Sequence, residues 1–240
     1  VISYGEVYVL EVNPRSSRTV PFLSKITGVP MANLAMKGIL GESLKSKGYE
    51  TGLIEESKNV YTKVPVFSFQ KLKDVDTTLG PEMKSTGEVM GSDENLEKSL
   101  YKGLVSAGIK VKDQGSVLFT ISGTAKEEAY GLAKRFSDLG YHIMATKGTA
   151  KYFEDKGLHV ETVGKIDEEG KYEHDVLGLI YKGLVDMVIN TAAKKKTARN
   201  DGFKIRRAAS EQEIACLTSL DTTDALLKVL ESISFNVSSI

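Results

Sequence analysis

The sequence has a single cysteine, Cys216, so it forms no internal disulfide, and we expect a reducing compartment. The neighbours of this cysteine are apolar, which favours a packed core thiol, because a reactive thiolate needs a cation or a helix N-terminus beside it. The three histidines lie far apart without metal-ligand spacing, and no apolar run reaches the length of a membrane span or a signal peptide. We therefore expect a cytoplasmic protein.

The sequence also lacks an excess of charge of either sign. Lysine and arginine number 32, aspartate and glutamate number 32, and the formal net charge is zero. No overall field favours a nucleic acid or an anionic membrane, so we expect neither as a partner, and any basic site must be local. A length of 240 residues with 41% hydrophobic residues is enough for one large or two modest domains with buried cores.

The second half of the chain alternates short apolar runs with amphipathic stretches, which is typical of parallel βα units. Thr124 to Glu127 has the pattern of a helix capping box, and Gly140 would end that helix. A last helix would be capped by Asp221 or Thr222. The predicted strands are 117–121, 141–145, 159–163, 187–190 and 215–218. This pattern predicts an α/β domain with a doubly wound parallel sheet.

The first half has a less regular pattern. We predict an apolar strand over 7–12, helical structure over 20–47, an edge strand over 64–69, a loop over 74–92 and a helix over 93–107 that begins with Asp93 and Glu94 and stops at Gly108. The abrupt start without an initiator methionine suggests a fragment. We place the domain boundary between about 105 and 115, which divides the chain into 1–108 and 109–240.

The first candidate site follows the strand predicted over 7–12. Alternation along a strand puts Glu11 and Asn13 on one face, where their oxygens could hold a magnesium ion against a phosphate that pairs with Arg15 or Arg18. The alternative is a strand that ends in a turn, with Glu11 paired to a nearby arginine.

The second candidate site lies at the carboxyl ends of the predicted parallel strands. Thr146-Lys147-Gly148-Thr149 joins a strand to a helix, so backbone amides and hydroxyls converge there as an anion site. Lys165 and Asn190-Thr191 follow two further strands and would gather at the same edge. Basic residues follow at Lys194, Lys195, Lys196, Arg199, Arg206 and Arg207, and a mononucleotide phosphate would suit this edge. The alternatives are a structural helix cap and a solvated charged surface.

Two long motifs carry a family resemblance. The stretches 11–22 (EVNPRSSRTVPF) and 79–91 (LGPEMKSTGEVMG) resemble the ATP-grasp part of the carbamoyl-phosphate synthetase large chain. The resemblance implies Mg²⁺ or Mn²⁺ bound by Glu11 and Asn13, with Arg15 and Arg18 facing oxygens of ATP or carboxyphosphate. The parent enzyme would make carbamoyl phosphate for pyrimidine and arginine synthesis, together with the remainder of the large chain and a glutaminase small chain.

The second half resembles the methylglyoxal-synthase-like domain that ends this large chain. The matching stretches are 146–149 (TKGT), 163–165 (VGK), 189–191 (INT) and 201–207 (DGFKIRR). The resemblance implies an allosteric nucleotide, UMP as inhibitor with IMP or phosphoribosyl pyrophosphate as activator in some members. The implied pocket comprises Thr120, Lys126, Thr146, Lys147, Gly148, Thr149, Lys165, Asn190 and Thr191. Ala192 stands where some relatives have a second threonine, which leaves the choice of activator open.

Three further expectations follow. The rest of the ATP site would lie before Val1, so we expect the chain alone to be catalytically inactive. A stand-alone methylglyoxal synthase is the first alternative, with Asp175 as its base, but the loop 191–201 has no histidine to serve as the acid. The second alternative is a ligand-free module that self-associates or binds another subunit through the basic loop.

Overall fold

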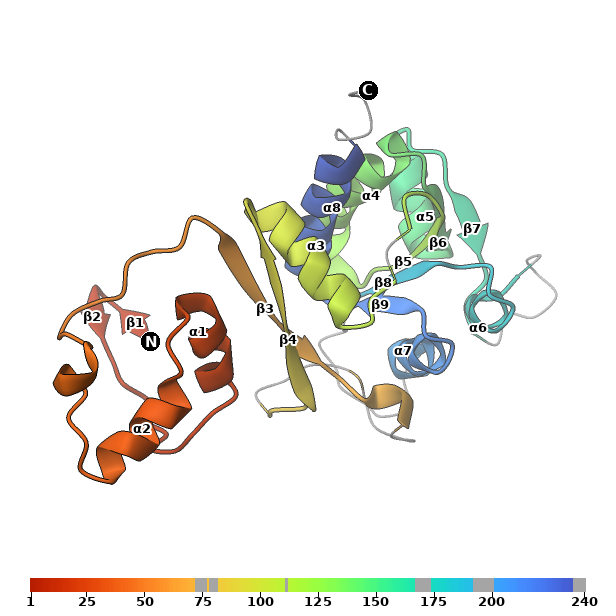
Figure 1. Cartoon of the computed structure of the whole chain (residues 1–240). Helices are drawn as coiled ribbons and strands as arrows, with labels where there is room; N and C mark the ends of the chain where they lie inside the picture. Colours follow the sequence, from red (N-terminus) through yellow and green to blue (C-terminus); the bar gives the residue numbers. More distant parts are fainter. Residues whose placement is uncertain (72–76, 78–81, 111, 167–173, 192–200, 235–240) are drawn as a thin grey trace. The chain divides into compact units, whose positions relative to one another are not determined.

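The computed structural model describes residues 1–71, 77, 82–110, 112–166, 174–191 and 201–234. The chain divides into two compact units, Val1–Lys58 and Asn59–Ile240 (Figure 1). In these described ranges, no helix is long and apolar enough to cross a membrane.

The first unit is a small hairpin followed by short helices. Strands β1 (Ile2–Ser3) and β2 (Glu6–Val7) pair antiparallel, and α1 (Thr19–Thr27), α2 (Met31–Ile39) and the 3₁₀ turn η1 (Lys45–Lys47) follow. The helical region predicted over 20–47 is therefore interrupted. Gly28 ends α1 in the left-handed conformation at φ 70°, and Pro30, which has no amide hydrogen, precedes α2.

The strand predicted over 7–12 is wrong beyond Val7. Residues 8–14 have no regular structure, and the side chains of Val9, Leu10 and Val12 are 76%, 78% and 77% exposed. An apolar run becomes a strand only where a neighbouring strand pairs with it and a core covers it, and the described part of this unit supplies neither to these residues.

The second unit begins with an antiparallel hairpin and a helix. Strand β3 (Val60–Val66) pairs with β4 (Gly87–Asp93) in the register Val60↔Asp93 to Val66↔Gly87. In this two-stranded sheet β3 is an edge strand, as predicted, although it begins four residues earlier and ends before the 3₁₀ turn η2 (Phe69–Lys71). The loop predicted over 74–92 is wrong from Gly87 onward, because β4 pairs with β3 there; residues 74–76 and 78–81 lie outside the described ranges.

Helix α3 (Leu96–Ser106) packs closely on this hairpin. It begins at the cap residue Asn95, whose Oδ1 accepts the amide hydrogen of Lys98 at 2.9 Å, so the predicted start at Asp93 is wrong. It stops before Gly108, which is left-handed at φ 86°. The Thr62 hydroxyl of β3 donates to the Ser99 carbonyl of α3 at 2.9 Å. The backbones of β4 and α3 approach each other at Gly91 of β4, where no side chain separates them.

The centre of the second unit is a five-stranded parallel sheet in the order β7-β6-β5-β8-β9. Its strands are β5 (Ser116–Thr120), β6 (His142–Thr146), β7 (Glu161–Val163), β8 (Met187–Asn190) and β9 (Ala215–Leu217). The chain winds outward from β5 through β6 to β7, then returns to β8 and continues to β9. The predicted doubly wound parallel sheet is confirmed, with strand ends within two residues of the predicted ones.

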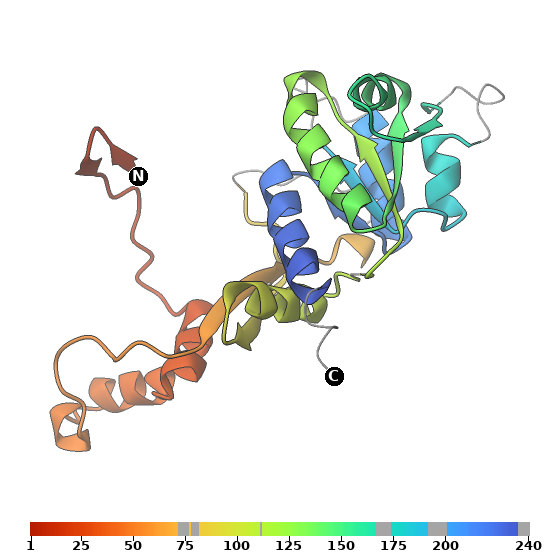
Figure 2. The same cartoon turned by 90° about the horizontal axis from the view of Figure 1, so that it is seen from above.

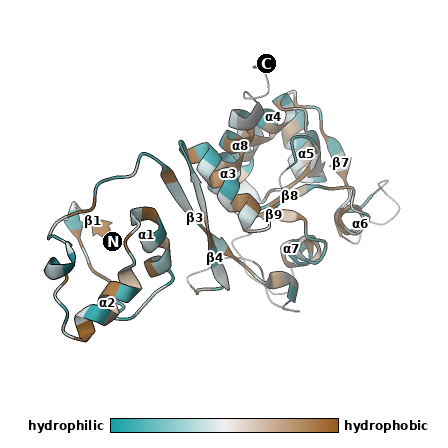
Figure 3. Cartoon of the chain, in the orientation of Figure 1, coloured by the Kyte–Doolittle hydropathy of each residue, from teal (hydrophilic) through white to brown (hydrophobic). Residues whose placement is uncertain are grey.

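Helices cover both faces of this sheet (Figures 1 and 2). They are α4 (Lys126–Asp138), α5 (Lys147–Glu154), α6 (Val176–Tyr181), α7 (Asp201–Glu211) and α8 (Leu220–Ser234). Alternation along β5 sends Val117 and Phe119 into a core with α4, α5 and α8, and Leu118 into a core with α6 and α7. Hydrophobic residues, brown in Figure 3, mark these central strands.

Helix α4 does not begin with the predicted capping box. A 3₁₀ turn, η3 (Gly123–Ala125), precedes it, and its cap residue Ala125 makes no side-chain hydrogen bond. At its other end the polypeptide turns at Gly140, left-handed at φ 88°, as predicted. Helix α8 begins at Leu220, one residue before the predicted caps.

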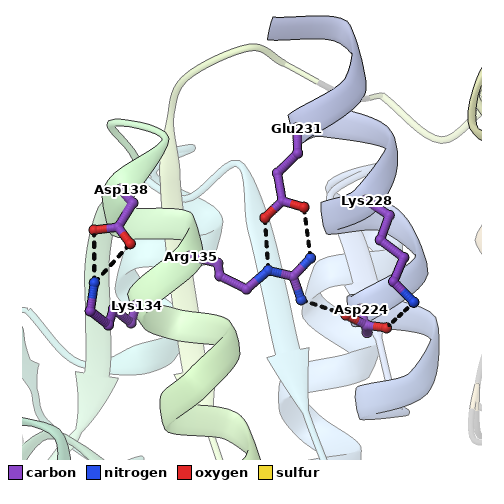
Figure 4. A network of polar contacts seen from close by, with 6 residues as sticks. All are labelled: Lys134, Arg135, Asp138, Asp224, Lys228 and Glu231. Carbon is purple, nitrogen blue, oxygen red and sulfur yellow. Dashed lines mark hydrogen bonds and ion pairs between the residues drawn. The ribbon is translucent and has the colours of Figure 1, made fainter. Parts of the chain in front are cut away.

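A charged network joins α4 to α8 (Figure 4). The Arg135 guanidinium donates to both oxygens of Glu231, Nε to Oε1 at 2.7 Å and Nη2 to Oε2 at 2.9 Å, and to Asp224 Oδ1 at 2.5 Å. These carboxylates raise the pKa of Arg135. Lys228, in the same helix, pairs with the other oxygen of Asp224 at 2.9 Å. Asp224 and Glu231 lie about two turns apart on α8, so the contacts of Arg135 hold that length of α8 against α4.

The division into compact units falls fifty residues before the predicted boundary at 108. Val64 of β3 and Leu104 of α3 belong to the same core as the α4 and α8 side chains, which places the hairpin and α3 with the parallel sheet. The predicted boundary separates two family-like parts of the sequence, and it stays a prediction.

Candidate functional site

All five parallel strands end at the same edge of the sheet. The winding direction reverses between β5 and β8, whose last residues, Thr120 and Asn190, are paired neighbours. Open α/β sheets hold ligands outside the carboxyl ends of their strands at such a reversal point. The residues of the second predicted site follow these strands and lie at this edge.

Three buried polar side chains form a hydrogen-bond chain at the reversal point. Thr120, Asn190 and Arg206 are 8%, 3% and 4% exposed. The Asn190 amide nitrogen donates to the Thr120 hydroxyl oxygen at 2.6 Å, and Nη1 of Arg206 donates to the Asn190 amide oxygen at 2.8 Å. Arg206 comes from α7, so the chain joins a helix to two adjacent strand ends.

Arg206 is a buried member of this hydrogen-bond chain and was not among the residues of the predicted pocket. In the sequence it is one member of a basic stretch. The available signal was its place beside Ile205, Ala208 and Ala209, which are buried residues of α7. An arginine on the apolar face of a helix is a candidate for a buried polar contact.

The first turn of α5 lies at the same edge of the sheet, directly after β6. Thr146 is the cap residue, extended at φ −66° and ψ 147°, and its side chain makes no capping hydrogen bond. The amides of Lys147, Gly148 and Thr149 open the helix, where its dipole favours an anion. Lys126 of α4 reaches this turn, because its ammonium donates to the Gly148 carbonyl at 2.6 Å.

Thr149 has a structural part in this arrangement. Its side chain is 1% exposed, and its hydroxyl lies 3.3 Å from the Ile121 amide and 3.4 Å from the Ile121 carbonyl. The Thr149 hydroxyl accepts a hydrogen bond from the Ile121 amide and donates one to the Ile121 carbonyl. These two hydrogen bonds connect α5 to the residue that follows β5.

The remaining predicted residues lie at the neighbouring strand ends. Thr191 follows β8, and its hydroxyl oxygen accepts the Ser122 amide hydrogen at 3.1 Å. Lys165 is exposed two residues after β7. Lys194, Lys195, Lys196 and Arg199 lie outside the described residues. Arg207 pairs with Glu211 at 2.7 Å and reaches the Phe69 carbonyl at 3.5 Å.

Cys216 is a packed thiol, as predicted. It contacts the core of α6 and α7 side chains, and burial raises its pKa to about 12, although the nearby Arg206 opposes part of that rise. A raised pKa favours the protonated thiol, which is the less nucleophilic form, near neutral pH.

The first predicted site lies in the other unit. The Asn13 amide nitrogen donates to Glu11 Oε1 at 3.2 Å, and both residues are exposed. Arg15 donates to the neighbouring Ser16 carbonyl at 3.2 Å, and Arg18 is the half-buried cap residue of α1. The four side chains are close in sequence, but the strand expected to align Glu11 and Asn13 is absent from residues 8–14.

Glu11 and Asn13 fit part of a magnesium site. A carboxylate and an amide oxygen are suitable ligands for Mg²⁺ or Mn²⁺. The 3.2 Å contact places the two side chains side by side, but the Asn13 amide nitrogen faces Glu11, so the amide would have to turn over for both oxygens to face one ion. Within the described ranges there is no cluster of three carboxylate, histidine or cysteine side chains, so this pair would supply two ligands of a larger set.

Asp175, the base required by the methylglyoxal synthase alternative, caps a helix. Its Oδ1 accepts the Gly178 amide hydrogen at 2.5 Å at the start of α6. This contact gives the carboxylate a structural role and does not favour that alternative.

Two family models match the chain in separate segments. Residues 2–47 match the carbamoyl-phosphate synthase L chain, ATP binding domain, and residues 128–218 match the MGS-like domain. The two matches in this order confirm the predicted resemblance. A solved structure titled "Crystal structure of ForH" is 20% identical over 50% of this chain and 78% of that chain, with a TM-score of 0.36, and carries no argument about function.

Proposed function

We propose that this chain, in which an MGS-like domain follows a segment of the carbamoyl-phosphate synthase large-chain ATP-binding domain, is the carboxy-terminal part of such a large subunit. The MGS-like domain binds a phosphorylated ribose compound at the carboxyl edge of its sheet, with the nucleotide UMP as the first candidate and IMP or phosphoribosyl pyrophosphate as the others. The nucleotide is an allosteric effector of carbamoyl phosphate synthesis.

One observation carries this proposal: hydrogen-bond donors from four strand ends converge at one edge. Thr120 and Asn190 meet at the reversal point, Thr191 follows Asn190, and the first amides of α5 open beside them. Lys147 at the first position of α5 and Lys165 after β7 add positive charge. The phosphate monoester of a nucleotide is mainly a dianion at neutral pH and then offers acceptor oxygens and negative charge, which matches this arrangement.

The parent activity belongs to the same proposal. The ATP-binding segment comes from an ATP-dependent ligase family, in which ATP and a divalent metal are used. Glu11 and Asn13 would hold the metal ion, which stabilises phosphate charge, and Arg15 and Arg18 would pair with phosphate or carboxyphosphate oxygens. The remainder of the large chain and a glutaminase small chain would be the partners, and the product would serve pyrimidine or arginine synthesis.

An effector acts only if it binds two conformations of the parent with unequal affinity. In the second unit, α7 links the reversal point to the segment after β3, because Arg206 contacts Asn190 and Arg207 contacts the Phe69 carbonyl. The helix α3 and the stretch 79–91 are the expected route onward. If mutation of these segments in the full enzyme leaves effector control unchanged, this route is wrong.

Calorimetric titration with UMP in phosphate-free buffer tests the binding site. Lys147→Ala removes a charge from the start of α5, and Lys182→Ala is the matched control, because Lys182 is exposed at the end of α6, before β8 begins. We expect saturable binding that Lys147→Ala weakens about three- to tenfold, a loss of roughly 0.7–1.4 kcal/mol, and that Lys182→Ala leaves unchanged.

Three results would count against the proposal. No heat with UMP, IMP or phosphoribosyl pyrophosphate favours a ligand-free assembly module, which light scattering would then detect as a concentration-dependent mass. Equal loss of affinity in both lysine variants indicates a diffuse charge effect without a defined site. Because the chain alone is expected to be inactive, measurable carbamoyl phosphate formation by it would contradict the proposed division of labour.

A further inference from the structure

The hydrogen-bond chain Arg206–Asn190–Thr120 has a fixed direction. A guanidinium group has donors and no acceptor, so the Asn190 atom 2.8 Å from Arg206 must be the amide oxygen. The Asn190 amide nitrogen therefore faces Thr120, 2.6 Å away, and must be the donor there. The orientation of the Asn190 amide follows from the charge of Arg206.

The direction of this chain determines what the Thr120 hydroxyl can offer. Its oxygen accepts from Asn190, so its proton points elsewhere, and the described part of the structure contains no second side-chain hydrogen bond of this hydroxyl. The Thr191 hydroxyl is oriented in the same way, because it accepts the Ser122 amide hydrogen. The hydroxyl of Thr120, at the end of β5, and the hydroxyl of Thr191, directly after β8, can therefore each donate a hydrogen bond to a ligand.

We propose that Arg206 is a positioning residue that makes the reversal point a donor-only surface, which selects ligand oxygens that carry no proton. This inference rests on the proposed function, since the ligand oxygens belong to a phosphate or another oxyanion bound at this edge. Arg206 itself acts through Asn190, and the Thr120 hydroxyl makes the contact. All three side chains are at most 8% exposed, so water competes little with these hydrogen bonds.

Substitution of Asn190 reverses the hydrogen-bond direction with almost no change in shape. Asn190→Asp replaces the amide by a carboxylate, which pairs with Arg206 and has no proton for Thr120. The Thr120 hydroxyl then donates toward residue 190 and turns a lone pair toward the ligand. We expect UMP affinity to fall about tenfold or more, because a donor to an anion becomes an acceptor, while the melting temperature without ligand is unchanged or higher.

Inorganic anions provide a readout that simple damage to the fold would not change. At pH 8 sulfate has no proton, whereas hydrogen phosphate has one that it can donate. The donor-only surface of the unmodified chain should bind both within about threefold of each other, measured by competition against UMP. Asn190→Asp should lose sulfate at least about tenfold more than phosphate, because only phosphate can donate to the reversed Thr120 hydroxyl.

The Thr120 hydroxyl has a matched pair of variants. Thr120→Val removes the hydroxyl at nearly constant volume and should weaken UMP about tenfold, whereas Thr120→Ser keeps it and should stay within about threefold. Arg206→Met should weaken UMP in the normal background and have less effect in the Thr120→Val background, because Arg206 acts through that hydroxyl. If Arg206→Met does not fold, the Asn190 and Thr120 variants still decide the matter.

The outcomes separate this inference from the proposed function. If the unmodified chain binds UMP and the Asn190→Asp and Thr120→Val variants bind it equally well, the inference is wrong and the nucleotide site stands. An unchanged ratio of sulfate to phosphate affinity in Asn190→Asp also overturns it. If the unmodified chain binds neither UMP nor either anion, the proposed function fails and the inference fails with it.

Discussion

Gly91 is the position where one added methyl group should separate two elements of the second unit. A Cβ atom at Gly91 would lie 1.9 Å from the Ser99 carbonyl oxygen, 2.7 Å from the Gly103 amide nitrogen and 2.7 Å from the Thr62 hydroxyl oxygen. Two of these atoms belong to the backbone of α3, so a side-chain rotation cannot relieve the contact. Gly91→Ala therefore forces α3 away from β4.

The size of the effect follows from the required displacement. Non-bonded heavy atoms are normally about 3.5 Å apart, so the α3 backbone must move by roughly 1.5 Å. The same movement stretches the 2.9 Å hydrogen bond between Thr62 and the Ser99 carbonyl. Overpacking of this kind costs about 3 kcal/mol or more, which corresponds to a melting temperature lower by about 6–12 °C for a chain of this size.

Gly87→Ala is the matched control in the same strand. A Cβ atom there would lie 3.7 Å from Val66 Cβ, an ordinary van der Waals contact, and its φ is not positive. We expect a change within about 1 kcal/mol, in either direction. Thermal unfolding followed by circular dichroism, together with hydrogen exchange of the β3 and β4 amides, measures both variants. Equal stability of the two variants would refute the argument that α3 and β4 are in direct contact at Gly91.

Three other predictions concern charges and the thiol. Arg135→Met should lower the free energy of unfolding in urea by about 1–2 kcal/mol, because Asp224 and Glu231 lose a shared, half-buried partner, and salt should reduce the difference. Lys228 and Arg135 lower the pKa of Asp224, so the stability that this carboxylate contributes is complete above its unfolded pKa of about 4 and is lost as the pH falls through the lower folded pKa. The melting temperature should therefore fall less steeply between about pH 5 and 2 in Arg135→Met than in the unmodified chain. An identical slope in the two proteins would argue against the Arg135–Asp224 pair. With its pKa raised to about 12, Cys216 should react with a thiol reagent at pH 8 only after denaturation, and rapid labelling of the native chain would contradict its burial.

The regular part of the fold could be read from local patterns. The apolar runs that became β5, β6, β7, β8 and β9 are short, bounded by turn residues and separated by amphipathic stretches, so their type and their parallel arrangement were predictable. The first half was harder, because local apolar content pointed the wrong way in two places. The apolar run 7–12 pairs with another strand only at Val7. The stretch that begins at Gly87, with only two apolar side chains before Asp93, pairs with β3 over its whole length as β4.

The sequence by itself determined the edge at which the site lies, because parallel strands bring the residues that follow them to one side of a sheet. Asn190 and the start of α5 were placed together on that ground, whereas Thr120 was included only because of the family resemblance. Only the tertiary structure decided how these groups are used. In that structure the Thr149 hydroxyl is hydrogen-bonded to Ile121, and Arg206 of α7 donates a hydrogen bond to Asn190. Such contacts depend on side-chain burial and hydrogen-bond direction between segments distant in sequence, which no local pattern encodes.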